Sequence, residues 1–368
     1  MKILVYAYLR QNFGDDLLAF IMCKRYPEHE FYFMCDASYQ SRGDRPANFK
    51  ICSNADPEGG FQLFVDRAAT RMGLCRPSLK RAIRDNNYDF YLILGGSMFI
   101  ESSWHHALNS YHEHAYAIKQ VKGSGVVDSN FGPYRNVFYR RLFEHLFRRL
   151  GFVSFRESHS YELFHKLENV SWGSDLVFSL ERTKSPKKSF DRHVIVVPVD
   201  VESRNNIAQH ADAYYELIAQ YLNNLSEKTR VSFVSFCDYE GDSAACDAII
   251  KRLDNDILDV SYYPYTSVDE VLWLFETGSS VIASRFHAIF LAAAFGIPVL
   301  PLSYSKKIDH CFDDLGVTSQ IPSISIVKDL RRIDSSSFIR LSANQLAAAA
   351  SCEKQFDAFQ NALSNAGH

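Results

Sequence analysis

The chain has 368 residues, of which 47% are hydrophobic and 23% are charged, and its formal net charge is −3. This is the composition of a globular protein, and the length predicts two domains. The weakly acidic balance argues against a general nucleic-acid binder, and no window approaches the run of about eighteen apolar residues that a membrane span requires.

Cysteine usage and the start of the chain indicate an intracellular protein. The eight cysteines form no C-x-x-C pair and show no regular spacing, which is typical of a chain that keeps its thiols reduced. The first apolar run is too short for a signal peptide. We therefore expect a cytoplasmic location, either free or peripheral on the inner face of the membrane.

Short β-rich runs alternate with amphipathic helices along the chain, which predicts parallel α/β units. In the first half, strands are expected at Ile3–Leu9 and Glu30–Cys35, with the helix Leu17–Tyr26 between them. Two further strands are expected in "YDFYLILGG" and "FVSFRESHS". The carboxyl ends of parallel strands share one edge of the sheet, and ligands bind at that edge.

Two glycine-containing turns are predicted at this edge. "NFGDD" and "LGGSMF" can bring the backbone close to a ligand, and the aspartates of the first turn can accept hydrogen bonds from sugar hydroxyls. Alternatively, one of these aspartates complements the dipole of the helix that follows. The candidate acceptor-binding residues are Asn12, Gly14, Asp15, Asp16, Gly95, Gly96 and Ser97.

Two segments of the first half have an unusual composition. "HHALNSYHEHAYA" carries four histidines, but only His105 and His112 approach the spacing of one helical face, so no metal site is predicted. The helix in "NVFYRRLFEHLFRRLGF" should dock an apolar face that includes Phe138 and Phe143 on the sheet, with its arginines in solvent. The alternative is an interfacial helix that rests on anionic lipid.

The polar, lysine-rich stretch "LERTKSPKKSFDR" is the best candidate for an interdomain linker. A second series of strands is expected after it, in "HVIVVPV", "RVSFVSF", "ILDVSYY", "SSVIAS" and "IPVLPL". We therefore predict an α/β protein with two Rossmann-like domains facing each other across a cleft. Their bounds are 1–180 and 193–334, with a linker at 181–192 and a helical tail at 335–368.

The stretch "VIASRFHAIFLAAAFGIPVL" is the most informative part of the second domain. Ser284 is a favoured N-cap after the strand, and Gly296 with Pro298 ends the helix. Arg285 and His287 therefore fall in the first helical turn. Backbone N–H groups and the helix dipole favour an anion there, and both side chains add cationic donors. The alternative is a salt bridge at Arg285 beside a half-buried histidine.

Two more basic groups are predicted at strand ends. The loop in "PLSYSKKID" carries Tyr304 and Lys307, and adjacent loops at one sheet edge can converge on one ligand. Arg156 follows a strand of the first domain, where it would close the other half of an anion clamp across the cleft. Its alternative role is an ion pair with Glu157 or with a neighbouring helix.

Taken in order, "NFGDD", "LILGGSMF", "FRESHS", "SDLVF", "SRFHAIFLAAAFGIPVL" and "YSKKI" resemble the polysaccharide pyruvyl transferase family. The resemblance implies a GT-B-like fold and a transferase. Such an enzyme moves the pyruvyl group of phosphoenolpyruvate onto a sugar hydroxyl pair of a cell-surface polysaccharide, or of its lipid-linked precursor, as a ketal. Phosphoenolpyruvate is then a co-substrate, and neither a cofactor nor a nucleic-acid partner is implied.

The resemblance also assigns residues. Arg285 and His287 match the family's Arg-x-His, Lys307 matches the lysine of Tyr-x-x-Lys, and Arg156 matches an arginine that follows a strand. The implied donor-binding residues are Arg156, Ser284, Arg285, Tyr304 and Lys307. Ser97 stands where a third glycine is common, so the acceptor side matches the family less closely than the donor side.

The chemistry of the implied donor agrees with these basic residues. Phosphoenolpyruvate carries a phosphate and a carboxylate on three carbons, so it needs cationic partners away from water. Arg285 and His287 are the predicted catalytic residues, with His287 as general acid and base.

Two other functions compete with this one. A GT-B-type glycosyltransferase with a nucleotide-sugar donor would also need a basic site for a diphosphate. A non-catalytic partner in a glycan-assembly complex would not need a clustered anion site, which argues against it.

Overall fold

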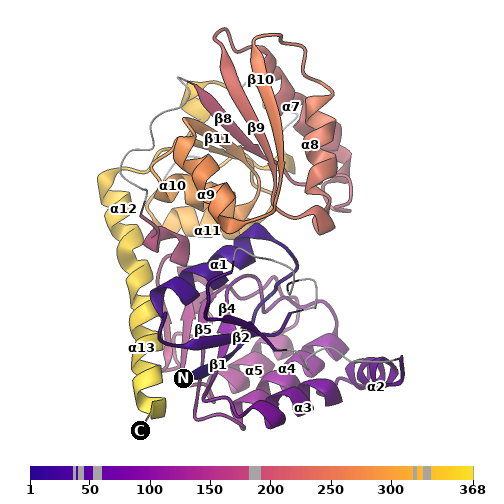
Figure 1. Cartoon of the computed structure of the whole chain (residues 1–368), viewed down its shortest axis with the longest axis vertical. Helices are drawn as coiled ribbons and strands as arrows, with labels where there is room; N and C mark the ends of the chain where they lie inside the picture. Colours follow the sequence, from indigo (N-terminus) through magenta and orange to yellow (C-terminus); the bar gives the residue numbers. More distant parts are fainter. Residues whose placement is uncertain are drawn as a thin grey trace. The chain divides into compact units, whose positions relative to one another are not determined.

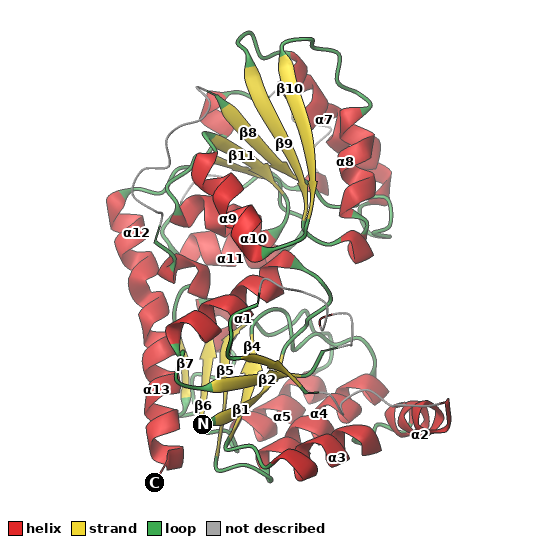
Figure 2. Cartoon of the chain, viewed as in Figure 1, coloured by secondary structure: helices red, strands yellow, loops and turns green. Residues whose placement is uncertain are grey.

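The computed structural model describes residues 1–35, 39, 45–52, 60–181, 192–317, 321–325 and 333–367. The chain divides into two compact units. The first comprises Met1–Leu9, Leu18–Leu176 and Ser351–His368, and the second comprises Arg10–Leu17 and Val177–Ala350. Each unit has its own sheet with helices packed against it (Figure 1; Figure 2). Most of the expected linker, residues 182–191, lies outside the described residues.

The first unit is built on a seven-stranded parallel sheet in the order β3-β2-β1-β4-β5-β6-β7. Its strands are β1 (Lys2–Tyr6), β2 (Glu30–Phe33), β3 (Phe49–Ile51), β4 (Phe90–Leu94), β5 (Gly123–Ser129), β6 (Phe152–Phe155) and β7 (Val170–Trp172). Its helices are the greater part of α1 (Phe13–Arg25), α2 (Gly60–Arg71), α3 (Pro77–Asn86), α4 (Trp104–Ile118), α5 (Val137–Phe147), α6 (Ser158–Glu162) and α13 (Glu353–Gly367).

Three strands of this sheet, β3, β5 and β7, are absent from the sequence-based prediction. Strand β5 reads "GSGVVDS", which has no aromatic residue and only two β-branched ones, Val126 and Val127, among small and polar residues that rarely indicate a strand. Its glycines have a packing reason. A Cβ at Gly125 would lie 2.0 Å from the Phe152 ring, and one at Gly123 would lie 2.6 Å from the Phe90 ring. The Phe152 and Phe90 rings thus fill the space that side chains at these two positions of β5 would otherwise occupy.

Aromatic side chains fill the core of the first unit. Phe99, Phe143 and Phe147 contact one another with ring centroids 5.1 to 6.3 Å apart. One residue of the predicted docking face is placed differently, because Phe138 is 59% exposed and Tyr139 is buried in the core. The reason is helical spacing, because the buried residues of α5 lie on one face of the helix and Phe138 lies off that face; they are Tyr139, Phe143, Leu146 and Phe147.

The C-terminal helix α13 belongs to the first unit. Phe359 packs edge-to-face on Tyr26 and Phe90, with ring centroids 5.1 and 5.6 Å away. Gln355 is fully buried beside strand β5, where its Oε1 accepts a hydrogen bond from the Asp128 N–H at 2.8 Å. The segment predicted as one helical tail is therefore divided, since 335–350 groups with the second unit and 351–368 with the first.

The second unit has a five-stranded parallel sheet in the order β10-β9-β8-β11-β12. Its strands are β8 (His193–Val197), β9 (Thr229–Ser235), β10 (Leu258–Pro264), β11 (Ser280–Ala283) and β12 (Val299–Pro301). Its α-helices are α7 (Ala211–Asn223), α8 (Asp242–Ile250), α9 (Val268–Thr277), α10 (Phe286–Ala294), α11 (Lys306–Asp314) and α12 (Ala343–Ala349). Short 3-10 turns include η4 (Asp238–Glu240).

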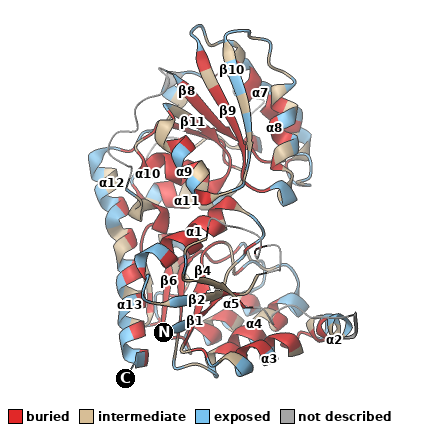
Figure 3. Cartoon of the chain, in the orientation of Figure 1, coloured by how far each residue is buried: buried red, intermediate tan, exposed pale blue. Residues whose placement is uncertain are grey.

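The central strands explain why both sheets were predictable as parallel. Strands β4 and β8 are buried along their whole length (Figure 3), as expected when helices cover both faces of a sheet. Within the described part of the chain, no helix has the length and apolar character that crossing a membrane demands.

Candidate functional site

The loop between β11 and α10 presents Arg285 and His287 at the carboxyl end of the second sheet. Arg285 is the N-cap of α10, with extended backbone angles of φ −71° and ψ 129°, and His287 lies in the first turn. Ser284 was expected as the N-cap, but it lies one residue too early. Its hydroxyl is instead hydrogen-bonded to the Tyr214 hydroxyl at 2.8 Å, and Ser284 is fully buried.

Arg285 is held by two carboxylates. Its Nε donates to Asp242 Oδ2 at 2.8 Å and its Nη2 to Asp242 Oδ1 at 2.5 Å, while Nη1 donates to Glu240 Oε2 at 2.7 Å. Burial lowers the pKa of the guanidinium, but the Asp242 carboxylate more than offsets this, so the pKa is raised well above its ordinary value. The salt-bridge alternative for Arg285 is thus present at the strand end where an anion site was expected.

The next loop brings Tyr304 and Lys307 to the same region. The Lys307 ammonium lies 5.4 Å from the ring centre of Phe286, the residue next to Arg285. In this loop Lys307 is half-buried, whereas the neighbouring Lys306 is exposed. The Tyr304 ring lies 4.7 Å from the guanidinium carbon of Arg204, a residue that the sequence analysis did not single out.

The turn "NFGDD" groups with the second unit and not with Gly95–Ser97. Gly14 lies against His287, because a Cβ at position 14 would be 2.0 Å from the imidazole Nδ1. Asn12 Oδ1 accepts from the Gly14 N–H at 3.0 Å, and Asp16 Oδ2 accepts from the Tyr265 hydroxyl at 2.7 Å. Asp15 lies in the first turn of α1, where its charge complements the helix dipole.

Helix α1 begins at Phe13, four residues earlier than predicted. The Phe13 N–H donates to the Phe236 carbonyl at 3.0 Å, and the Phe13 ring packs on the Phe236 ring at 4.4 Å. The first turn of α1 therefore has its packing partners in the second unit, which local sequence alone does not show.

In the first unit, Gly95, Gly96 and Ser97 follow strand β4. Both glycines have positive φ angles, 71° and 61°, which accounts for their residue type. The Ser97 hydroxyl donates to Asn130 Oδ1 at 3.2 Å. Arg156 Nη2 donates to the same oxygen at 2.8 Å, so the structure groups Arg156 with three of the expected acceptor residues.

Arg156 is fully buried and pairs with aspartates. Its Nη1 lies 3.1 Å from Asp175 Oδ2 and 4.0 Å from Asp128 Oδ2. The neighbouring Glu157 Oε1 accepts a hydrogen bond from the Ser160 hydroxyl. These contacts fix the Arg156 guanidinium at the carboxyl end of the first sheet.

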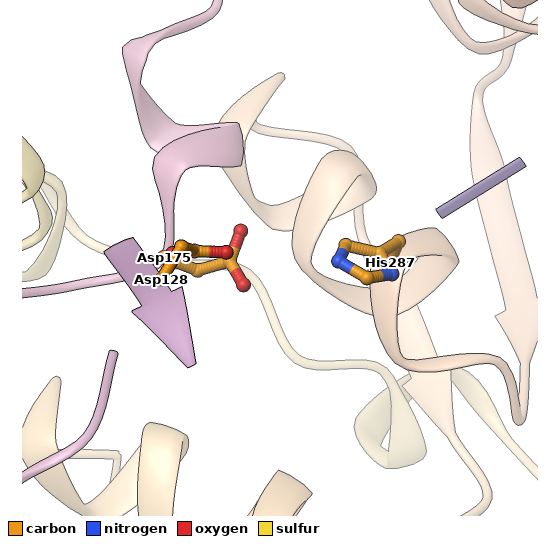
Figure 4. A group of neighbouring side chains, drawn as sticks. All are labelled: Asp128, Asp175 and His287. Atoms are coloured by element: carbon orange, nitrogen blue, oxygen red, sulfur yellow. The ribbon is translucent and has the colours of Figure 1, made fainter. Parts of the chain in front are cut away.

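Asp128 and Asp175 form a buried carboxyl pair (Figure 4). Their oxygens approach within 4.8 Å, and Asp128 has the left-handed φ of 60° that non-glycine residues rarely adopt. Burial and the Asp175 carboxyl raise the pKa of Asp128 well above its ordinary value, against the opposing effect of Arg156.

The four-histidine segment has no common focus among the described residues. His114 is fully buried, and its ring nitrogens are hydrogen-bonded to the Tyr91 hydroxyl at 2.7 Å and the Ser110 hydroxyl at 3.2 Å. Burial lowers the pKa of His114 to about 3. His112 Nδ1 lies 2.7 Å from the Gly73 carbonyl oxygen, while His105 is exposed.

Sequence reasoning missed most residues that hold the basic side chains. The strand-end signal that singled out Arg156 and Arg285 is also present in "DVESR" after β8, in "CDYEGD" after β9 and in "VVDSN" at β5. The missed residues are Asp128, Asn130, Asp175, Arg204, Glu240, Asp242 and Gln355.

The fold defines the class of the protein. The S. aureus MnaA–UDP complex is similar at a TM-score of 0.62 and 12% identity, covering 99% of this chain and 96% of that one. UDP-GlcNAc 2-epimerase from Neisseria meningitidis, bound to UDP-GlcNAc, has a TM-score of 0.62 and 11% identity over 98% of this chain and 100% of that one. The chain thus has a GT-B-type fold.

The family follows from the sequence itself. A family model described as polysaccharide pyruvyl transferase matches residues 6–306. The chain belongs to the polysaccharide pyruvyl transferase family, which confirms the resemblance. A search of curated protein sequences finds no match.

Proposed function

We propose that the protein transfers the pyruvyl group of phosphoenolpyruvate to two hydroxyls of a saccharide and releases phosphate, leaving a cyclic ketal. The observation that carries the proposal is the pair Arg285 and His287 at the start of α10, inside the segment matched by the family model. A helix N-terminus with cationic donors suits a phosphorylated, doubly acidic donor.

The reaction requires a proton at the donor's methylene carbon. Protonation gives an oxocarbenium-like centre at C2, which one sugar hydroxyl attacks with loss of its own proton. Phosphate then leaves with the C2–O bond electrons, and the second hydroxyl attacks C2 with loss of its proton and closes the ring. His287 is the proposed proton donor and acceptor, a role worth about 10²–10⁴-fold in rate.

The remaining proposed roles follow from position. Lys307 and Tyr304 lie near Arg285 in the second unit and are assigned to the donor, as are Ser284 and Arg156. The packing of Gly14 on His287 supports the assignment of 12–16 to the acceptor, whose hydroxyls must reach the catalytic imidazole. Gly95, Gly96 and Ser97 keep their proposed acceptor role beside Asn130.

The proposal is tested by product mass. The protein is incubated with phosphoenolpyruvate and a panel of galactosides and N-acetylhexosaminides, and a mass gain of one pyruvyl ketal is expected. His287→Ala should retain donor binding and lose turnover, whereas Arg285→Ala should lose donor binding. Normal phosphate release by both variants would contradict the proposed roles.

A nucleotide-sugar transferase is the second candidate. Its support is that the similar structures named above contain UDP or UDP-GlcNAc. Ligand-induced melting shifts separate the two, because a ligand that binds the native state raises the melting temperature. Stabilisation by phosphoenolpyruvate and not by UDP favours the pyruvyl transferase, and the reverse result favours the alternative.

The proposal also includes a lipid-linked acceptor. Val137 and Phe138 are 46% and 59% exposed at the start of α5, next to Arg141. An exposed apolar pair with arginines suits contact with anionic lipid, which would bring a lipid-linked acceptor to a cytoplasmic enzyme. Cosedimentation with anionic vesicles, lost in Phe138→Ser, is the expected result.

A further inference from the structure

Arg204 and Arg285 meet on one carboxylate oxygen. Arg204 Nη2 lies 3.1 Å from Glu240 Oε2, and Arg285 Nη1 donates to the same atom at 2.7 Å. The two arginines follow β8 and β11, which are neighbours in the second sheet, and Glu240 follows β9 on the other side of β8. Two guanidinium groups thus converge at the ligand edge of this sheet.

The two carboxylates on Arg285 differ in how firmly they are held. Asp242 has a side chain with no exposure, and its Oδ2 also accepts the Phe236 and Cys237 backbone N–H groups at 3.2 and 3.0 Å. Glu240 is 27% exposed, and among the described residues its carboxylate hydrogen-bonds only to the two arginines. Asp242 is therefore a fixed partner of Arg285. The Glu240 carboxylate, by contrast, can move away without breaking a hydrogen bond to a backbone N–H group.

Arg204 has a second support that does not depend on Glu240. Its Nε donates to the Asp200 carbonyl at 3.1 Å, and its guanidinium lies over the Tyr304 ring at 4.7 Å. Both contacts would keep the guanidinium in place if Glu240 moved away. Arg204 Nη1 makes no hydrogen bond to the described residues, so it can serve a ligand.

We propose that Arg204 and Arg285 form a two-arginine phosphate site in which Glu240 is a built-in competitor that the phosphorylated donor displaces. The inference rests on the proposed function, because it names the group that shares the donor with Arg285. A phosphate offers more acceptor oxygens and more charge than one carboxylate, so it can bind both guanidinium groups at once. Glu240 meanwhile keeps the two cations paired when no donor is bound.

The test is calorimetric titration of the full-length chain with inorganic phosphate and, separately, with phosphoenolpyruvate. Glu240→Gln removes the competitor and should bind phosphate at least about tenfold more tightly, equivalent to about 1.4 kcal/mol. Arg204→Gln should weaken phosphoenolpyruvate binding by about tenfold or more. A gain of affinity in Glu240→Gln cannot arise from damage to the fold.

Arg252→Gln is the matched control for Arg204. Arg252 is 30% exposed, pairs with Asp212 at 2.7 Å and lies over the Tyr215 ring at 5.6 Å, so it has the same kinds of contact away from the sheet edge. Its loss should leave the binding of both ligands unchanged. Glu240→Asp is the second variant if Glu240→Gln does not fold, because the shorter side chain cannot reach both arginines.

The outcomes separate the inference from the proposed function. If the Glu240 variants bind phosphate more tightly but the wild type forms no ketal product, the site is supported and the pyruvyl transfer is contradicted. Unchanged or weaker phosphate binding by folded Glu240 variants, or an Arg204→Gln variant that behaves like Arg252→Gln, overturns the site even if the ketal forms. Failure of the wild type and of both Glu240 variants to bind either ligand overturns both.

Discussion

The contact between Gly14 and His287 gives the sharpest prediction. In Gly14→Ala the new Cβ would lie 2.0 Å from His287 Nδ1 and less than 3 Å from two ring carbons, whereas ordinary contact begins at 3.4 Å. The imidazole must therefore retreat by the difference, about 1.4 Å. Misplacing a catalytic group by about 1 Å can cost about 100-fold in rate, which corresponds to about 2.7 kcal/mol in the barrier.

The assay is phosphate release from phosphoenolpyruvate in the presence of an acceptor. Gly14→Ala should lower kcat by about 100-fold, and Gly367→Ala, where an added Cβ meets no atom within 4 Å, should not. If the effect acts through the imidazole, the double variant Gly14→Ala/His287→Ala should be no slower than His287→Ala alone. A wild-type rate in Gly14→Ala, or an additive loss in the double variant, would refute the reasoning.

Three further predictions concern stability. Asp242→Ala removes two of the three carboxylate hydrogen bonds of the buried Arg285 and leaves the Phe236 and Cys237 N–H groups without their acceptor, so it should cost about 3–5 kcal/mol in urea unfolding. Asp212→Ala at an exposed pair should cost at most about 1 kcal/mol, and equal losses would contradict the prediction. Gln355→Leu removes hydrogen bonds to the Asp128 N–H, the Asp128 carboxylate and the Ser174 carbonyl, so the melting temperature should fall, and an unchanged value would show that these groups find other partners. The pKa of His114 is lowered from 6.5 to about 3, so below pH 6.5 the unfolded chain binds a proton that the folded chain does not, and stability should fall by about 1.4 kcal/mol per pH unit down to about pH 3. His114→Asn should flatten this dependence, and an unaltered pH profile would contradict the assignment.

The strands that could be predicted from the sequence are those with a continuous run of apolar side chains. "HVIVV" and "FYLIL" are apolar along their whole length, because helices cover both faces of each sheet. Strand β5 escaped prediction since its glycines make room for the Phe90 and Phe152 rings, which come from strands on either side of it. That space is a property of the assembled sheet and cannot be found in a local window.

In the candidate site, too, some residues could be found from a local segment of sequence and others could not. Arg285 and His287 could be found because a strand, a helix start and two basic residues lie in one short segment. Their partners come from other strand ends, and the order of the strands in the sheet decides which of these ends are neighbours. Asp242 and Glu240 therefore became identifiable only when β9 was known to lie beside β8.

The return of the C-terminal helix to the first unit has a consequence for synthesis and dissection. Phe359 and Gln355 of α13 complete the core of the first unit, and all seven strands of that unit lie before residue 177. An N-terminal fragment ending near residue 180 would expose the apolar side of β5 and β6 and should aggregate, unless α13 is supplied in trans. On the ribosome, the first unit must likewise wait until α13 has been translated before its core is complete.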